Sequence, residues 1–320
     1  MSKAGYIGVS NLARKIKKMY VGVDGVARQV KKAYVGDAYN KARLWYTARY
    51  FEYTGNYTEQ EVTIGGKAYV LYTLTSSGTL KCSEAQYWMC GGGAGGHDGI
   101  KNYCSGGGGG GGYVKSGTLS AGSYVMTIGA GGTKNMGGSA SIIGNGDITA
   151  NGADGYNSSY YHGDGGSGGS GGGAGSYCNS NGSNYHPGTP GTGAVTSTYP
   201  FGLTTLYAHC PGGGAGSEFW QNKTHSAAGH GGNGGTNGSN GKNSSNASSS
   251  GSMTGGTGGE RGGGNGSGNG YGNTTATGGS FYGAGGGGGH RSYDEYNNSY
   301  ATGKGGTGYQ GVMYVLQEAA

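Results

Sequence analysis

Short apolar runs recur every 14 residues over the first fifty positions of the chain. Residues 6–19 align with residues 20–33, and a third unit starts at Tyr34 and slips by one residue before Ala42. Short β-branched runs flank Asp24-Gly25, a dipeptide that accepts the positive φ of a tight hairpin turn. The pattern predicts a module of 14-residue β-hairpin repeats over residues 1–49, too small to be stable without a partner.

A second β pattern covers residues 50–143. Apolar and polar positions alternate over residues 61–64, a largely apolar run covers residues 68–74, and the Gly-Gly turn between them completes a hairpin pattern. Further strands are expected at residues 79–82, 85–90, 113–119 and 123–128, with a weaker one at 139–143. An uninterrupted apolar run at residues 311–317 predicts a strand buried within a sheet. We therefore expect residues 306–320 to close the β region, which we interpret as sandwich-like.

Between residues 144 and 305 the dominant period changes to three. Glycine occupies every third position from Gly163 to Gly175 and again from Gly232 to Gly241, a period that fits neither a helix nor a strand. It is the period of the polyproline II helix, which has no internal hydrogen bonds and leaves its backbone groups to its neighbours. Without Cβ atoms such helices can approach closely. We expect a polyglycine II bundle whose rod ends are joined by the aromatic segments between the glycine tracts.

Composition narrows these interpretations. The chain has 83 glycines among 320 residues but only 4 prolines, which excludes a collagen-like helix. Because only 32% of the residues are hydrophobic, disorder of the glycine-rich middle stays an alternative. Aromatic residues interrupt the tracts and strands flank them, which favours order. The expected fold is mainly β: N-terminal β-hairpin repeats, a β-sandwich-like region and a glycine-rich polyproline II bundle with aromatic loops.

Charge is concentrated at the start of the chain. Residues 1–50 contain 11 of the 21 Lys and Arg residues but 2 of the 15 Asp and Glu residues. Such a segment suits an acidic protein surface or nucleic acid; a solvated charged face is the simpler interpretation, and we expect no nucleic-acid partner. The N-terminus lacks the apolar core of a signal peptide, and no stretch is long enough for a transmembrane helix. We therefore expect synthesis in a cytoplasm and no membrane insertion.

Signals for catalysis or metal binding are weak. Matches to G-x-G-x-x-G arise by chance in so glycine-rich a chain, and none lies between a strand and a helix. Cys90, His97 and Cys104 lack the spacing of a standard zinc site, and the five cysteines are odd in number and irregularly spaced, which favours reduced thiols. We expect no enzyme activity, no cofactor and no bound metal.

The aromatic composition points instead to binding. The chain has 28 Tyr but 4 Phe and 3 Trp, set among Ser, Asn and Gly, as in adaptable binding surfaces. Tyr and Trp offer flat faces to sugar rings with a polar group nearby. Part of these residues can instead cap the rods or pack between them. The candidates for exposed contacts at loop tips are Tyr160, Tyr161, Tyr185, His186, Phe219, Trp220, Tyr293 and Tyr296.

Several blocks occur in an order that resembles a known group of proteins. A strand ends in the glycine block 91–96, the tract 106–112 follows, then comes Leu-Ser-Ala-Gly at 119–122, and the block 283–289 precedes the last strand. This order resembles the glycine-rich tail proteins of bacteriophages and prophages. The N-terminal repeat is similar to a short repeat in tail proteins of phages that infect Gram-positive bacteria.

The resemblance implies a structural protein of the virion tail, made in the bacterial cytoplasm and placed at the distal tail or fibre. It implies that residues 1–49 bind other tail or baseplate proteins and that the loops bind a carbohydrate or protein of the host surface. It also implies a homo-oligomer, for which a trimer is the form usual in fibres. The alternative is a purely architectural tail or filament subunit without receptor specificity.

Overall fold

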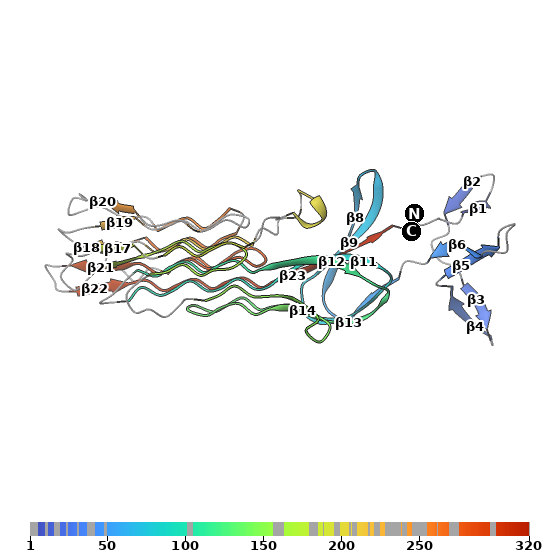
Figure 1. Cartoon of the computed structure of the whole chain (residues 1–320), viewed down its shortest axis with the longest axis horizontal. Helices are drawn as coiled ribbons and strands as arrows, with labels where there is room; N and C mark the ends of the chain where they lie inside the picture. Colours follow the sequence, from blue (N-terminus) through green and yellow to red (C-terminus); the bar gives the residue numbers. More distant parts are fainter. Residues whose placement is uncertain are drawn as a thin grey trace.

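The computed structural model describes the β region and most of the glycine-rich body. The described residues are 6–9, 12–15, 20–23, 25–30, 32–36, 42–47, 50–100, 105–155, 163–178, 185–187, 189–194, 199–204, 206, 210–216, 218–220, 225–227, 238, 242–244, 255–260, 262–268, 275–294 and 299–319. The molecule is elongated, with the first strands at one end, the β region next to them and the glycine-rich body extending to the other end (Figure 1). No helix in these ranges is long and apolar enough to span a membrane.

The N-terminal repeats form hairpins, as the 14-residue pattern predicts. The described residues pair as β1 with β2, β3 with β4 and β5 with β6, each pair in a two-stranded sheet of its own. Their bounds are Tyr6–Val9, Leu12–Lys15, Tyr20–Val23, Val26–Gln29, Lys32–Gly36 and Ala42–Thr47. Val23 and Val26 are register partners, and Gly25 in the turn between them has a φ of 78°, which glycine adopts without strain. In the third hairpin the register shifts between Ala33 and Tyr34.

Two sheets of the described chain make up the β region. The first has the order β15-β14-β13-β10-β7, formed by Ile148–Ala150, Ser141–Ile143, Gly122–Thr127, Gly78–Cys82 and Phe51–Tyr53. The second has the order β12-β11-β23-β9-β8, formed by Val114–Leu119, Ala85–Cys90, Val312–Glu318, Lys67–Leu74 and Tyr57–Ile64. The C-terminal strand β23 therefore lies between β11 and β9. A glycine-rich rod leaves the sheet after β11, and the last glycine-rich segment returns to it at β23, so the two lie on neighbouring strands.

The core lies on both faces of the second sheet. Between the two sheets, Leu80 and Met126 of the first pack with Met89 and Met313 of the second. On the opposite face a second cluster includes Trp88, Cys90, Val312 and Tyr314, and Cys210 from the glycine-rich body packs against it. Burial on both faces explains the uninterrupted apolar run of β23, since every position from Val312 to Leu316 is buried. The expectation of a mainly β fold with a sandwich-like region is confirmed.

The glycine-rich body consists of extended rods that bond sideways, with three-residue periodicity. Gly91, Gly92 and Gly93 donate backbone hydrogen bonds of 2.9–3.0 Å to three different segments, at Tyr113, Ser139 and Tyr309. The next three amides, of Ala94, Gly95 and Gly96, donate to the same three segments at Gly110, Met136 and Gly306. Donors that turn through three directions in three residues are what a threefold extended helix without internal hydrogen bonds requires.

Glycine is needed in these rods because the backbones touch. A Cβ atom added to Gly288 would lie 2.1 Å from the carbonyl oxygen of Gly106, and one added to Gly285 would lie 2.1 Å from that of Gly109. Both distances are far inside van der Waals contact, and the obstacle is backbone on each side. The rods can therefore approach this closely only because their glycines carry no side chains.

The way in which rods are joined differs in part from our expectation. The amides of Gly172 and Gly175 donate to the carbonyls of Gly166 and Gly163, so residues 163–175 are two antiparallel rods with a reversal between them. This reversal holds glycine and serine and no aromatic residue, which corrects the prediction that aromatic segments join the rod ends throughout. A second reversal, at Phe281 and Tyr282, does contain aromatic residues. Glycine alone is flexible enough to reverse the chain, so no aromatic residue is required.

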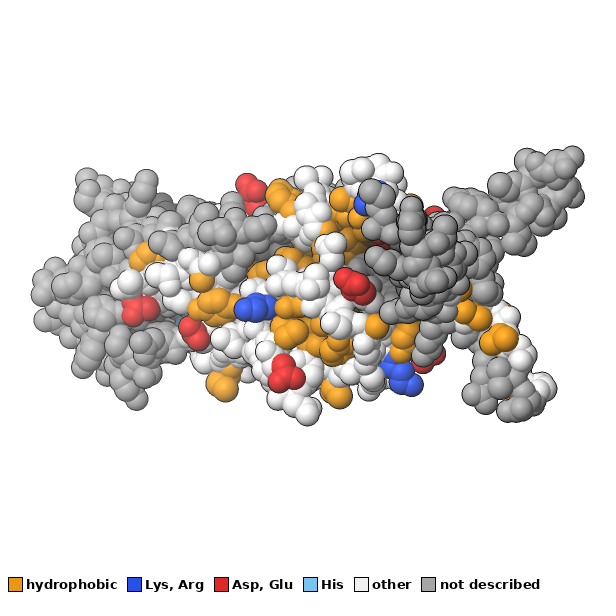
Figure 2. Space-filling model, turned by 45° about the vertical axis from the view of Figure 1, so that its right-hand side comes forward, with side chains coloured by type: hydrophobic (Ala, Val, Ile, Leu, Met, Phe, Trp, Pro, Cys, Tyr) orange, Lys and Arg blue, Asp and Glu red, His pale blue; other side chains and the backbone are white. Residues whose placement is uncertain are grey.

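One face of the described surface is poor in charge. Figure 2 shows hydrophobic side chains spread over it, with few charged ones between them. Among the exposed apolar residues are Val125, Met136 and Tyr309. Surface contacts in this region therefore depend on apolar and hydroxyl groups more than on ion pairs.

Candidate functional sites

The predicted contact residues divide into those the structure describes and those it does not. Tyr160, Tyr161 and Tyr296 lie outside the described residues. The backbone of the other five is described, in three strands near the end of the molecule opposite the N-terminal hairpins (Figure 1). Tyr185 and His186 belong to β17 (Tyr185–Pro187), Phe219 and Trp220 to β18 (Glu218–Trp220), and Tyr293 to β21 (Arg291–Asp294).

A sheet at this far end brings two of the predicted positions together. Its described order is β20-β19-β18-β21-β22, where β19 is His225–Ala227, β20 is Lys242–Ser244 and β22 is Ser299–Thr302. Strands β18 and β21 are parallel, with Trp220 and Tyr293 as register partners. Tyr293 is also the partner of Tyr300 in β22. The sheet thus aligns three aromatic positions in one row across neighbouring strands.

Tyr185 and His186 lie in a different sheet. Strand β17 pairs with β16 (Ser176–Cys178), and His186 is the register partner of Tyr177. No described pairing joins this hairpin to β18 or β21. The far end therefore presents at least two separate aromatic elements.

The base of the far-end sheet is anchored in the bundle. His290 and Arg291, at the start of β21, are 0% and 1% exposed. The His290 amide donates a 2.7 Å hydrogen bond to Ser267 Oγ, and His290 Nδ1 lies 3.1 Å from the same oxygen. The Arg291 guanidinium lies 5.7 Å from the centre of the Tyr300 ring, within cation–π range. Burial lowers the pKa of His290, which favours its neutral form.

A second candidate site, which our sequence predictions did not include, lies where the bundle meets the β region. A cavity of about 740 Å³ is lined there by residues of β11, β12 and a segment around residue 200. Those with side chains able to contact a ligand include Gln86, Trp88, Ser116, Thr118, Tyr199 and Phe201. The volume is within the range of small-molecule pockets.

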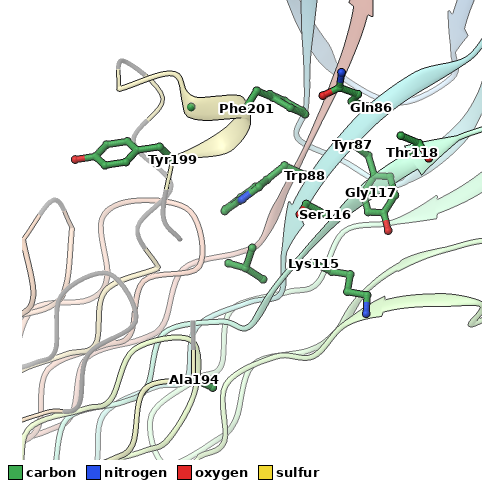
Figure 3. A pocket seen from close by; sticks show the side chains of 12 residues that line it. Gln86, Tyr87, Trp88, Lys115, Ser116, Gly117, Thr118, Ala194, Tyr199 and Phe201 are labelled. Carbon is green, nitrogen blue, oxygen red and sulfur yellow. The ribbon is translucent and has the colours of Figure 1, made fainter. Parts of the chain in front are cut away.

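Strand pairing explains how β11 and β12 contribute to this cavity. Trp88 is the register partner of Ser116, and Gln86 is the partner of Thr118. Because side chains alternate across a strand, these four residues lie on one face of the sheet, and Figure 3 shows Lys115 and Tyr87 directed away from that face. Gln86, Ser116 and Thr118 are exposed, whereas Trp88 is buried.

The opposite wall comes from a short 3₁₀ helix, η1 (Pro200–Gly202). Phe201 within it has a φ of 55°, and Cys210 further along has a φ of 42°; both values are costly for residues other than glycine. Packing of Phe201, Leu206 and Cys210 against Trp88 and its neighbours holds the segment in place. A hydrogen bond with Cys90, together with burial, raises the pKa of the Cys210 thiol, which favours the protonated form of Cys210.

Residues 70–315 match the model of a family described as Glycine-rich domain. The chain belongs to this family. The match runs from β9 to β23, and so takes in both the rods and the strands from which they leave and to which they return. It leaves out the N-terminal hairpins. No curated protein matches the chain.

The candidate zinc set of the sequence is not brought together in the described structure. Cys104 lies outside the described residues, and within them no group of three or more His, Cys, Asp or Glu side chains is placed to hold a metal ion. Cys90 packs with Cys210 in the apolar cluster. His97 Nδ1 lies 2.6 Å from the Asp98 carbonyl oxygen. The two residues thus have different surroundings.

Proposed function

We propose that the protein is a structural component of a bacteriophage tail, at the distal tail or fibre, and that its far end binds the surface of the host cell. The observation that carries this proposal is the arrangement along the long axis: basic hairpins at one end, and aromatic strands at the end of a glycine-rich bundle (Figure 1). The order of glycine blocks that resembles phage tail proteins supports the same reading.

The bundle suits the role of a stiff support. Its rods bond to neighbours on several sides, as the amides of Gly91, Gly92 and Gly93 illustrate. Buried His290 and Ser267 fix the base of the far-end sheet to these rods. A support of this kind holds weak contact elements at fixed separations, and several weak contacts to a repetitive surface add up through tethering. A host-surface carbohydrate or protein is the proposed partner of the far end.

The N-terminal hairpins suit the role of an attachment module. Isolated two-stranded hairpins are marginally stable in water, and in β3 and β4 the described apolar side chains of Tyr20, Val21 and Val26 are 50–58% exposed. We propose that tail or baseplate proteins cover these residues in the virion, in which the protein forms a homo-oligomer, with a trimer as the simplest fibre arrangement. The location of the protein would then be the virion tail, after synthesis in the host bacterial cytoplasm.

A truncation tests the division between attachment and recognition. A chain that begins near residue 50 keeps the β-sandwich and the bundle and loses the hairpins. We expect it to be absent from purified particles, as measured by mass spectrometry, while the isolated protein still binds host cells. Incorporation of the truncated chain at the level of the full chain would show that residues 1–49 are not the attachment module.

Replacement of the aromatic segments tests recognition itself. Segments 160–162 and 219–220 are replaced by Gly and Ser, and adsorption of the phage to host cells is measured. We expect adsorption to fall about tenfold or more, because multivalent binding amplifies the loss of each contact. The matched control is Asn145→Ser in the turn between β14 and β15. Unchanged adsorption after the double replacement would favour the purely architectural role.

A further inference from the structure

The cavity beside η1 has a polar row and an apolar wall that face each other. Gln86, Ser116 and Thr118 are exposed and lie on one face of β11 and β12. Their amide and hydroxyl groups can both donate and accept hydrogen bonds. A ligand that matches them must itself carry donors and acceptors side by side, as the hydroxyl groups of a sugar do.

The backbone of β12 adds to this row. Among the described strands of its sheet, β12 pairs with β11 and forms the edge. An edge strand presents unpaired N–H and C=O groups in alternation. Residues 115–118, which line the cavity, are all exposed. Hydroxyl groups of a ligand can bond to both kinds of backbone group.

The apolar wall consists of aromatic rings held by the fold. Phe201 and Trp88 extend toward the same space from opposite sides, whereas the ring of Tyr199 turns away from Trp88 (Figure 3). Phe201 is partly exposed, and Trp88 lies at the floor with 4% of its surface exposed. A partly exposed aromatic face next to hydroxyl and amide groups suits the C–H face of a sugar ring with its hydroxyl edge toward the polar row.

The backbone around Phe201 is strained, which a packing role alone does not require. Its φ of 55° lies in the left-handed region, where glycine costs less, and Gly202 follows directly with a φ of 73°. Strain of this kind concentrates where a side chain must be held in one position for binding. Phe201 is therefore the first residue to replace in a binding test, with thermal unfolding as the check on folding because it also packs against the Trp88 cluster.

Charge narrows the class of ligand. No carboxylate is among the described residues that line the cavity, and the charged residue among them, Lys115, directs its side chain away from the polar row (Figure 3). A cationic ligand would find no counter-charge there, so the site suits a neutral or anionic one. We propose that the cavity between η1 and the β11–β12 edge binds a short neutral or anionic saccharide. The identification of that saccharide as part of a host-surface polymer rests on the proposed function.

The test is binding of the full-length purified protein to an array of bacterial surface saccharides, followed by calorimetric titration of the saccharides that bind. Phe201→Gly removes the aromatic wall and relieves the backbone strain, and Thr118→Val removes one hydroxyl at nearly constant volume. We expect affinity to fall about tenfold for Phe201→Gly and about fivefold for Thr118→Val. Thr127→Val, an exposed strand residue of the other sheet, is the matched control and should bind like the wild type.

Several results would overturn the proposal. One is no binding of the wild-type protein to any saccharide on the array; another is binding by Phe201→Gly and Thr118→Val that equals wild-type binding, with thermal unfolding showing all variants folded. Selection of an extended peptide along β12 from a peptide library, without saccharide binding, would replace the proposed ligand by a protein strand. Each of these outcomes rejects the saccharide site.

A variant in which segments 160–162 and 219–220 are replaced distinguishes failure of the cavity proposal from failure of the proposed function. If it keeps saccharide binding that depends on Phe201, the cavity is a site of its own, whatever happens to adsorption. If it loses saccharide binding while the cavity variants keep it, recognition belongs to the far end and the cavity proposal is wrong.

Discussion

In the β-sandwich, Leu80 and Met126 bury whole side chains between two sheets and are 0% exposed. In the bundle, Gly109 and Gly288 are equally enclosed but contribute backbone alone, each donating a 2.8 Å hydrogen bond to a neighbouring rod. The first region is stabilised by apolar area removed from water. The second depends on satisfying every backbone donor and acceptor in a space that admits no side chain.

Because of this difference, the two regions respond in opposite ways to a change in side-chain size. A sandwich core is damaged chiefly by loss of volume, which leaves a cavity. The bundle has little side-chain volume to lose and is damaged by any addition, because the atoms in the way belong to other backbones. The two regions also meet at the ends of β11 and β13, where the Ser141 hydroxyl hydrogen-bonds to both. The following changes test this contrast, starting with the largest effect.

Addition of one methyl group inside the bundle should have the largest effect. In Gly288→Ala the new Cβ would lie 2.1 Å from the Gly106 carbonyl oxygen, so the rods must separate and their hydrogen bonds must break. We expect a loss of about 4 kcal/mol or more in the free energy of unfolding, with fast amide exchange in the bundle. The matched control is Gly22→Ala, where the added Cβ meets no atom within 4 Å. A Gly288→Ala protein as stable as the wild type would show that the rods are not closely packed.

Removal of volume from the sandwich should have the next largest effect. Leu80→Ala leaves a cavity between the two sheets and should cost about 3 kcal/mol in denaturant unfolding. Val125→Ala, on the same sheet but 52% exposed, should change stability by less than about 0.5 kcal/mol. Equal effects of the two substitutions would mean that side-chain burial does not stabilise this region.

Ser141 of β14 bridges the ends of β11 and β13, where the glycine-rich rods begin. Its buried hydroxyl donates a 2.7 Å hydrogen bond to the Cys90 carbonyl and accepts one of 2.9 Å from the Gly129 amide. Ser141→Ala leaves both backbone groups without this partner and should cost about 2 kcal/mol. Ser123→Ala, at an exposed position of β13, serves as the control. Loss of protection from amide exchange at Gly129 in the Ser141 variant would locate the effect.

A decrease in pH should have a smaller effect on stability. The histidines responsible for this effect lie in the bundle. Burial lowers the pKa of His97, despite an opposing effect of Asp98, and burial also lowers the pKa of His290. Because folding lowers the pKa of such a histidine, its neutral form favours the folded state. This contribution to stability is complete above the pKa of the unfolded chain, near 6.5. It is lost as the pH falls from that value toward the pKa of the folded protein. We expect the thermal midpoint to decrease between pH 7.5 and pH 5.

A variant and a control sharpen the pH prediction. His290→Gln should reduce the dependence in that window, since one of the two buried groups no longer titrates. Asp98 acts at lower pH: burial raises its pKa, but hydrogen bonds from the Gly305 amide and Lys134 outweigh this and hold it below the ordinary value of 3.8. A midpoint that stays constant or increases as pH falls from 7.5 to 5 would contradict the assignment.

The local signals in the sequence were sufficient to predict the N-terminal hairpins and most strands of the β region, whereas the segments that form β16–β22 were expected to be loops. The β-branched runs around Asp24-Gly25 predicted the hairpin of β3 and β4, and the apolar run at the C-terminus predicted a strand buried in a sheet. These patterns are local because a side chain's polarity decides which face of a strand it occupies. The far-end residues Trp220 and Tyr293 were selected by residue type, but nothing in the sequence indicates that they are register partners in parallel strands.

The amino-acid sequence alone determined where the chain forms strands and where it forms side-chain-free rods with a period of three. Tertiary structure decided which rods are neighbours, where residues 163–175 reverse, and that Trp88, Ser116 and Phe201 line one cavity. The physical reason is that a glycine rod carries no side chains to specify its partner. Its neighbours are set by hydrogen bonds between distant backbones, and by the flanking strands β11 and β23 that fix where the rods begin and end.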